Sequence, residues 1–159
     1  MKDNTIIDKI ARTIEHKELG KGGITPLPFV YADLGIQNVV FDNIEPPFAA
    51  AVPLATGTAE DERGMYHEEV TLAVFFGDIM CQQEVGFDAR HNERIIDECK
   101  QRAFQWLSSL VPAKEVELMS VNQCERAYQR ADAIVTGYIV SVTLREVQGY
   151  GRCGFGTIQ

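Results

Sequence analysis

The sequence predicts an α+β domain, with a mostly antiparallel sheet packed by two amphipathic helices. From Ile95 to Leu110, apolar side chains recur at spacings of three and four, which is typical of a helix with one buried face. From Ile134 to Val147, apolar and polar side chains alternate, which is typical of a strand with one buried face. A helix and a strand of this kind bury their apolar faces against each other in one core.

An N-terminal helix is predicted from the isoleucine spacing. Asp3 or Asn4 is expected to cap it, since a short side-chain oxygen there accepts a hydrogen bond from the first turn. The glycines at 20, 22 and 23 are expected to end it. Its apolar face consists of Ile6, Ile7, Ile10 and Ile14, and its polar face of Asp8, Lys9, Arg12 and Glu15.

The next part of the chain, from Thr25 to Met80, is predicted to be rich in β-strands. Short strands are predicted between Thr25 and Leu54, including Val39 to Phe41, and the prolines there indicate sheet edges. Residues 56–64 are polar and rich in glycine, which favours a solvated hairpin loop. Tyr66 to Met80 alternates and becomes apolar on both faces, so we expect a long strand that lies either at the centre of the sheet or at a face between subunits.

The second half begins with another polar connection, residues 82–91, followed by the main helix with Asn92 as its expected cap and Pro112 as its stop. Residues 116–121 suggest a short strand, and residues 125–132 are ambiguous between loop and strand edge. After the final strand, residues 149–159 alternate glycine with larger side chains. We expect a single domain over residues 1–148 and a flexible tail over residues 149–159.

The composition limits the function classes. Hydrophobic residues make up 45% and charged residues 24% of the 159 residues, as in globular proteins that bury about 70% of their unfolded surface. The formal net charge of −8 disfavours binding to nucleic-acid phosphates or anionic lipid. Neither a signal peptide nor an apolar run of about 18 residues is visible. We expect a cytoplasmic protein without a membrane or a sequence-specific nucleic-acid partner.

No motif for catalysis stands out. The four cysteines lack zinc-site spacing and are expected to be reduced. A serine-nucleophile elbow and a phosphate-binding loop are both missing. We therefore expect no catalytic residue, no cofactor and no metal. Two alternatives stay open: a small metal-dependent enzyme using His67, Glu69 and His91, and a ligand-binding module with its pocket between the sheet and the helix at residues 96–110.

Partner contacts are expected in the long polar connections and the tail. Long connections in a compact domain are uncommon unless they are functional, and aromatic or arginine side chains are frequent interface anchors. The candidate contact residues are Asp61, Glu62, Arg63, Glu84, Arg90, Tyr150, Arg152 and Phe155.

The order of these elements resembles the tail terminator and related neck or minor tail proteins of long-tailed bacteriophages. The segments that carry the resemblance are the helix at residues 6–14, the strand at 66–80, the helix at 96–110 and the strand at 134–147. Such proteins are small α+β subunits that form a ring, commonly a hexamer, which joins the tail tube to the head.

The resemblance implies a non-enzymatic structural protein of a phage or prophage, acting in virion assembly and head–tail joining. Its implied partners are other copies of itself, tail-tube proteins and head–tail connector proteins. It would be cytoplasmic during assembly and then part of the virion. The acidic charge agrees with this, because a negative ring lumen lets DNA pass without binding it.

Overall fold

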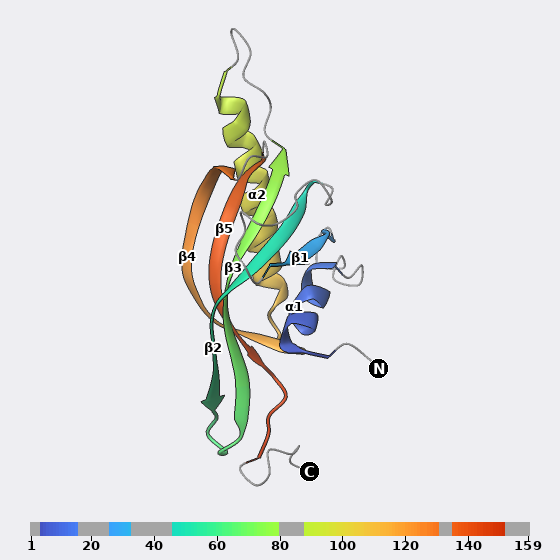
Figure 1. Ribbon diagram of the computed structural model, residues 1–159, viewed down its shortest axis with the longest axis vertical. Coiled ribbons are helices and arrows are strands. Elements are labelled where there is room, and N and C mark those ends of the chain that lie inside the picture. Colours follow the sequence, from blue (N-terminus) through green and yellow to red (C-terminus); the bar gives the residue numbers. More distant parts are fainter. Residues whose placement is uncertain (1–3, 16–25, 33–45, 80–87, 131–134, 152–159) are drawn as a thin grey trace.

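The computed structural model describes residues 4–15, 26–32, 46–79, 88–130 and 135–151, and it confirms the α+β class (Figure 1). The predicted strand at residues 39–41 lies outside these ranges. Along the chain, the elements are α1 (Ile6–Glu15), β1 (Phe29–Tyr31), β2 (Phe48–Glu60), β3 (Tyr66–Ile79), α2 (Arg90–Ser109), β4 (Val116–Arg130) and β5 (Val135–Glu146). Within the described ranges, no helix has the length and apolar character needed to cross a membrane.

The strands form one sheet in the order β1-β2-β3-β5-β4. β1 runs parallel to β2, and the other neighbouring strands are antiparallel, as in hairpins β2–β3 and β4–β5. The long strand β3 occupies the centre of the sheet, which is one of the two positions that its apolar faces predicted. Gly77 of β3 and Gly137 of β5 stand directly opposite each other, so the two backbones approach closely there.

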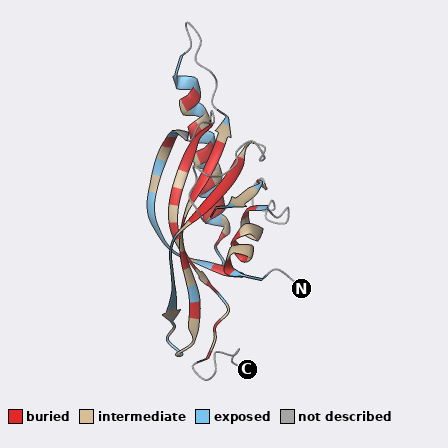
Figure 2. Cartoon of the chain, viewed as in Figure 1, coloured by how far each residue is buried: buried red, intermediate tan, exposed pale blue. Residues whose placement is uncertain are grey.

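The main core lies between the sheet and the two helices. Trp106 of α2 packs against Phe76 of β3, with ring centroids 5.8 Å apart, and α1 contributes Ile10 and Ile14. Figure 2 shows the buried residues concentrated in β3, β5 and the start of β2. The predicted apolar stripe of α2 is confirmed: Ile96, Cys99, Ala103, Trp106 and Leu107 are all buried. A smaller cluster, which includes Phe48 and Phe75, lies on the other sheet face.

Two strands are longer than predicted. Residues 56–60, predicted as a loop, are the outer half of β2 and pair with β3 as far as Glu60 opposite Tyr66. β4 is one strand of 15 residues, although the sequence predicted a short strand and an ambiguous segment. In both cases the strand lies at a sheet edge, where side chains stay in water and need no apolar alternation.

The helix caps also differ from the prediction. Thr5 caps α1: its Oγ1 accepts a hydrogen bond from the Asp8 backbone N–H at 3.1 Å, and the Asp8 carboxylate accepts one from the Thr5 N–H at 2.9 Å. This reciprocal pair is a capping box, so the role predicted for Asn4 falls to Thr5. α2 begins at Arg90, two residues before the predicted cap Asn92, and Arg90 and His91 are therefore helical.

Candidate functional site

A hairpin that extends beyond the helix-covered sheet is the candidate functional surface. We define the distal hairpin as residues 54–69, which comprise the outer half of β2, the turn at 61–65 and the start of β3. In Figure 1 it projects past α1, beside the chain that follows β5, and in Figure 2 most of it is exposed or half-buried. Exposed segments of this kind, positioned by a rigid sheet, often carry functional residues.

Asp61 organises the turn of the distal hairpin. Its Oδ1 accepts hydrogen bonds from the backbone N–H groups of Arg63 at 2.8 Å and Met65 at 3.1 Å. Gly64 follows with a φ of 79°, a conformation that favours glycine. The hydrogen bond with His67, together with these backbone donors, lowers the pKa of Asp61 to about 2. The turn therefore carries a fixed carboxylate.

His67 connects this turn to the end of β5. Its Nε2 lies 2.8 Å from Asp61 Oδ2, and its Nδ1 donates to the backbone carbonyls of Glu146 at 3.0 Å and Gln148 at 3.2 Å. The side chain is buried. A carbonyl oxygen can only accept, so Nδ1 carries the hydrogen that both carbonyls share. His67 thus cross-links two segments about 80 positions apart in sequence.

The segment after β5 is fixed against the same hairpin. The backbone N–H and carbonyl of Tyr150 exchange two hydrogen bonds of 2.8 Å with those of Tyr66. Gly149 packs so closely that a Cβ there would lie 2.9 Å from Met65 Cε and 3.0 Å from His67 Cε1. Residues 148–151 therefore add a short third segment to the distal hairpin.

The predicted contact residues fall at two ends of the molecule. Asp61, Glu62, Arg63 and Tyr150 gather at the distal hairpin. Arg90 lies at the opposite end, where α2 begins, and donates through Nε to Asp88 Oδ2 at 2.7 Å (Figure 1). The remaining candidates, Glu84, Arg152 and Phe155, lie outside the described residues. The distal hairpin is thus the only place where the described candidates cluster.

The residues considered for a metal site do not meet. His67 is held by Asp61, whereas Glu69 accepts a hydrogen bond from Arg145 at 3.1 Å. His91 belongs to the first turn of α2, at the other end of the molecule (Figure 1). In the described part of the chain, no three His, Cys, Asp or Glu side chains are grouped so as to hold a metal ion.

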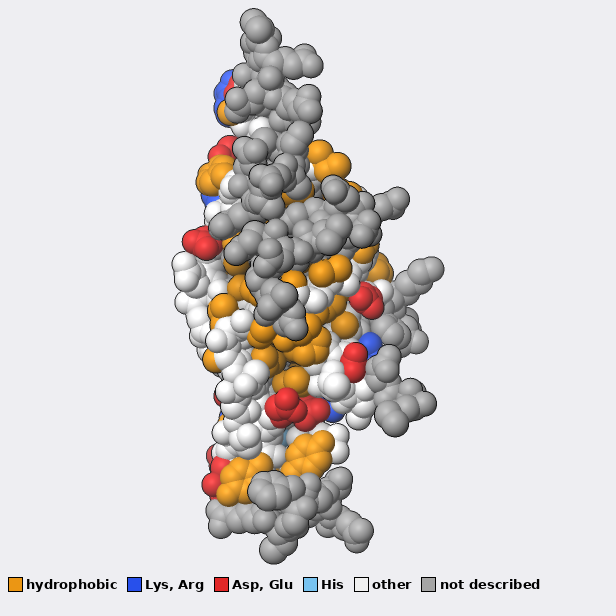
Figure 3. Space-filling view, in the orientation of Figure 1, with side chains coloured by type: hydrophobic (Ala, Val, Ile, Leu, Met, Phe, Trp, Pro, Cys, Tyr) orange, Lys and Arg blue, Asp and Glu red, His pale blue; other side chains and the backbone are white. Residues whose placement is uncertain are grey.

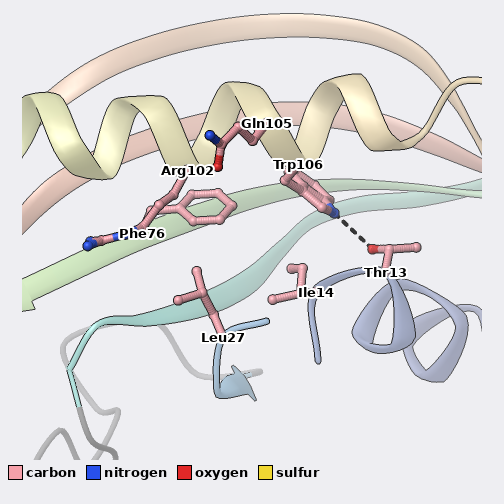
Figure 4. Close-up of a pocket in the computed structure, with 7 residues that line it drawn as sticks. All are labelled: Thr13, Ile14, Leu27, Phe76, Arg102, Gln105 and Trp106. Atoms are coloured by element: carbon pink, nitrogen blue, oxygen red, sulfur yellow. Dashed lines mark hydrogen bonds between the residues drawn. The ribbon is translucent and has the colours of Figure 1, made fainter. Parts of the chain in front are cut away.

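A small cavity lies where a ligand pocket was considered, between the sheet and the helices (Figure 4). Its volume is about 10 Å³, which is the room of one water molecule. Trp106 and Thr13 line it, and the Trp106 indole Nε1–H donates to Thr13 Oγ1 at 2.8 Å. This cavity lies among α1, α2 and β3 and is too small for an organic ligand.

One pair of charged residues was missed by the sequence interpretation. Lys9, assigned to the polar face of the first helix, is buried and forms an ion pair with Glu146. The burial of Lys9 could have been predicted from its position in the helix. It lies three residues after Ile6 and one before Ile10, at the margin of the apolar stripe. Burial also raises the pKa of the Cys99 thiol to about 11, which keeps it protonated and unreactive.

No protein-family model matches this chain, and no curated protein sequence matches it.

Proposed function

We propose that this chain is a non-enzymatic structural subunit of a phage or prophage, of the tail-terminator or head–tail connection type, which assembles with copies of itself into a ring. The observation that supports this most directly is the distal hairpin, an exposed arm whose conformation is already fixed within one subunit. A fixed arm loses little conformational entropy when a partner binds it, so its contacts translate more fully into affinity.

Three links hold this arm in place. The Asp61 carboxylate closes the turn, the His67 imidazole joins it to the carbonyls of Glu146 and Gln148, and the Tyr66–Tyr150 backbone pair ties down the following segment. The side chains left outside these links include Arg63, which is 78% exposed although its guanidinium lies 3.7 Å from Asp61 Oδ2. The arm therefore offers a preformed charged tip to a neighbouring subunit.

The element order also supports the proposal. The helix, long central strand, second helix and closing strand on which the resemblance depends correspond to α1, β3, α2 and β5. Figure 3 shows apolar side chains gathered in the middle of one face, with acidic and fewer basic side chains around them. A surface of this acidic character suits a ring through which DNA passes.

The proposal is tested by the mass of the assembled protein. Sedimentation velocity and native mass spectrometry over a wide concentration range should show a species larger than a dimer, and negative-stain electron microscopy should show it as a ring. A protein that stays monomeric at every concentration would contradict the proposal.

The role of the arm is tested by charge reversal. Arg63→Glu should weaken the assembly, because it replaces the exposed cation at the hairpin tip with one more acid beside those at positions 60–62. Lys114→Glu, which makes the same change of charge at an exposed position outside the hairpin, is the matched control and should assemble like the wild type. If both variants assembled as well as the wild type, the hairpin tip would not be part of the interface between subunits.

A further inference from the structure

In the described residues, the sheet has two open edges on opposite sides. β1 pairs with β2 only at residues 49–51. Beyond them, in the part of the chain that the structure describes, β2 from Val52 to Glu60 pairs with β3 alone. On the other side, β4 pairs with β5, and no further described strand follows it. Each open edge presents backbone N–H and C=O groups that can pair with another strand.

Both open edges contain an uncharged run. Residues 52–59 of β2 and residues 118–124 of β4 include no Asp, Glu, Lys or Arg, although 24% of the chain is charged. Leu54 is 58% exposed on the first run and Val121 is 44% exposed on the second. Edge strands that remain single usually carry lysine or other charges that prevent pairing. These runs lack charged side chains, and their protection is limited to Pro53 and the bulges in β2 and β4, so the rest of each edge can still meet a strand partner.

We propose that the open edge of β2 in one copy of this chain pairs with the open edge of β4 in the next copy, so that the sheet continues from subunit to subunit. This deepens the proposed function, on which it rests, by naming the surfaces that join the ring. A second copy is the fitting occupant because it supplies the complementary edge. In this contact the uncharged run of β2 faces the uncharged run of β4, which limits the electrostatic repulsion between two molecules of net charge −8.

The strands at both open edges are irregular and bent. β2 has a bulge between Pro53 and Ala55, and β4 has irregularities between Leu118 and Ser120 and between Val121 and Gln123. Bulges bend the strands that carry them, and β4 and β5 are visibly bowed in Figure 1. A head-to-tail contact between curved subunits gives a ring when the rotation per subunit closes.

The test blocks one edge at a time. Leu54→Lys places a charge on the β2 edge, and Val121→Lys places one on the β4 edge. Both side chains are already exposed, so each variant should keep the circular dichroism spectrum of the wild type. Thr58→Lys and Gln123→Lys are second variants on the same two edges. Gln101→Lys, at an exposed position of α2, is the matched control.

Native mass spectrometry then separates the possible outcomes. Each edge variant alone should be monomeric, and Gln101→Lys should assemble fully. An equimolar mixture of Leu54→Lys and Val121→Lys should give a one-to-one heterodimer, because one intact β2 edge meets one intact β4 edge. Full assembly of both edge variants, or homodimers of either, would overturn this interface while leaving a ring-forming wild type intact. A monomeric wild type would instead overturn the proposed function and this inference together.

Discussion

Lys9 of α1 and Glu146 at the end of β5 form an ion pair whose side chains are only 5% and 4% exposed. Lys9 Nζ contacts Glu146 Oε2, and Glu146 Oε1 is buried without a hydrogen-bond partner. The backbone carbonyl of the same glutamate accepts the hydrogen bond from His67. The first helix, the last strand and the distal hairpin therefore meet at one residue.

Removing one member of this pair should be strongly destabilising. Lys9→Met leaves the Glu146 carboxylate buried without its cation, and the expected loss is about 3–5 kcal/mol in the free energy of unfolding. Denaturant titration measures it. Lys9→Met combined with Glu146→Leu should cost much less than the single change, because no charge is then left unpaired.

The matched control for this pair is Arg12→Met. Arg12 lies on the same helix and pairs with Glu115 at 2.9 Å, but both side chains are partly exposed. Its loss should cost about 1 kcal/mol or less. If Lys9→Met cost no more than Arg12→Met, the burial of the Lys9–Glu146 pair would have no energetic consequence.

The turn of the distal hairpin should be sensitive to acid. The pKa of Asp61 is about 2 in the folded protein, against an ordinary value of 3.8. Because the folded-state value is lowered, the ionised carboxylate stabilises the fold above about pH 4, and this contribution is lost as the pH falls towards 2. Asp61→Asn should therefore be less stable than the wild type at neutral pH, and the difference should shrink across that interval.

Unfolding curves at a series of pH values measure this difference. Glu62→Gln, which removes the neighbouring carboxylate of the same turn, is the control for the change in net charge. A gap between Asp61→Asn and the wild type that stayed constant from pH 4 to pH 2 would show that Asp61 is not held by His67 and the turn.

The elements that the sequence predicted well are those with one face in the core. The stripe of α2 and the alternation of β5 reflect burial directly. The side chains that face the core recur with the period of the helix or strand, so apolar residues recur in the sequence at the same spacing. The outer half of β2 and most of β4 were missed for the converse reason. Their side chains are mostly exposed, so the pairing of their backbones leaves no periodic apolar signal.

The residues of the candidate site could be predicted from the sequence only in part. Acidic and arginine residues in the hairpin turn could be selected as contacts from composition. Their connection to Tyr150 depends on the pairing of Tyr66 with the chain after β5, which is a non-local backbone contact. His67 was considered as a metal ligand because imidazole chemistry alone does not distinguish a ligand from a cross-link to backbone carbonyls.

The glycine pair at the centre of the sheet should not tolerate a side chain. A Cβ at Gly137 would overlap the backbone carbonyl oxygen of Phe76, which cannot move without disturbing β3. Gly137→Ala should therefore lower the free energy of unfolding by at least about 2 kcal/mol. Gly57→Ala is the control, since a Cβ there meets nothing within 4 Å. Similar stabilities for the two variants in thermal unfolding would contradict the close backbone approach.

The hydrogen bond between Trp106 and Thr13 should hold α1 against α2. Thr13→Val keeps the shape of the side chain but removes the oxygen that accepts the indole N–H, leaving a buried donor unpaired. The expected loss is about 1–3 kcal/mol. Trp106 is the only tryptophan, so its fluorescence reports both the unfolding transition and its own surroundings. Thr58→Val, at an exposed position of β2, is the matched control and should change stability by about 0.5 kcal/mol or less. A Thr13→Val variant as stable as this control, with an unchanged emission maximum, would mean that the indole N–H is satisfied without Thr13.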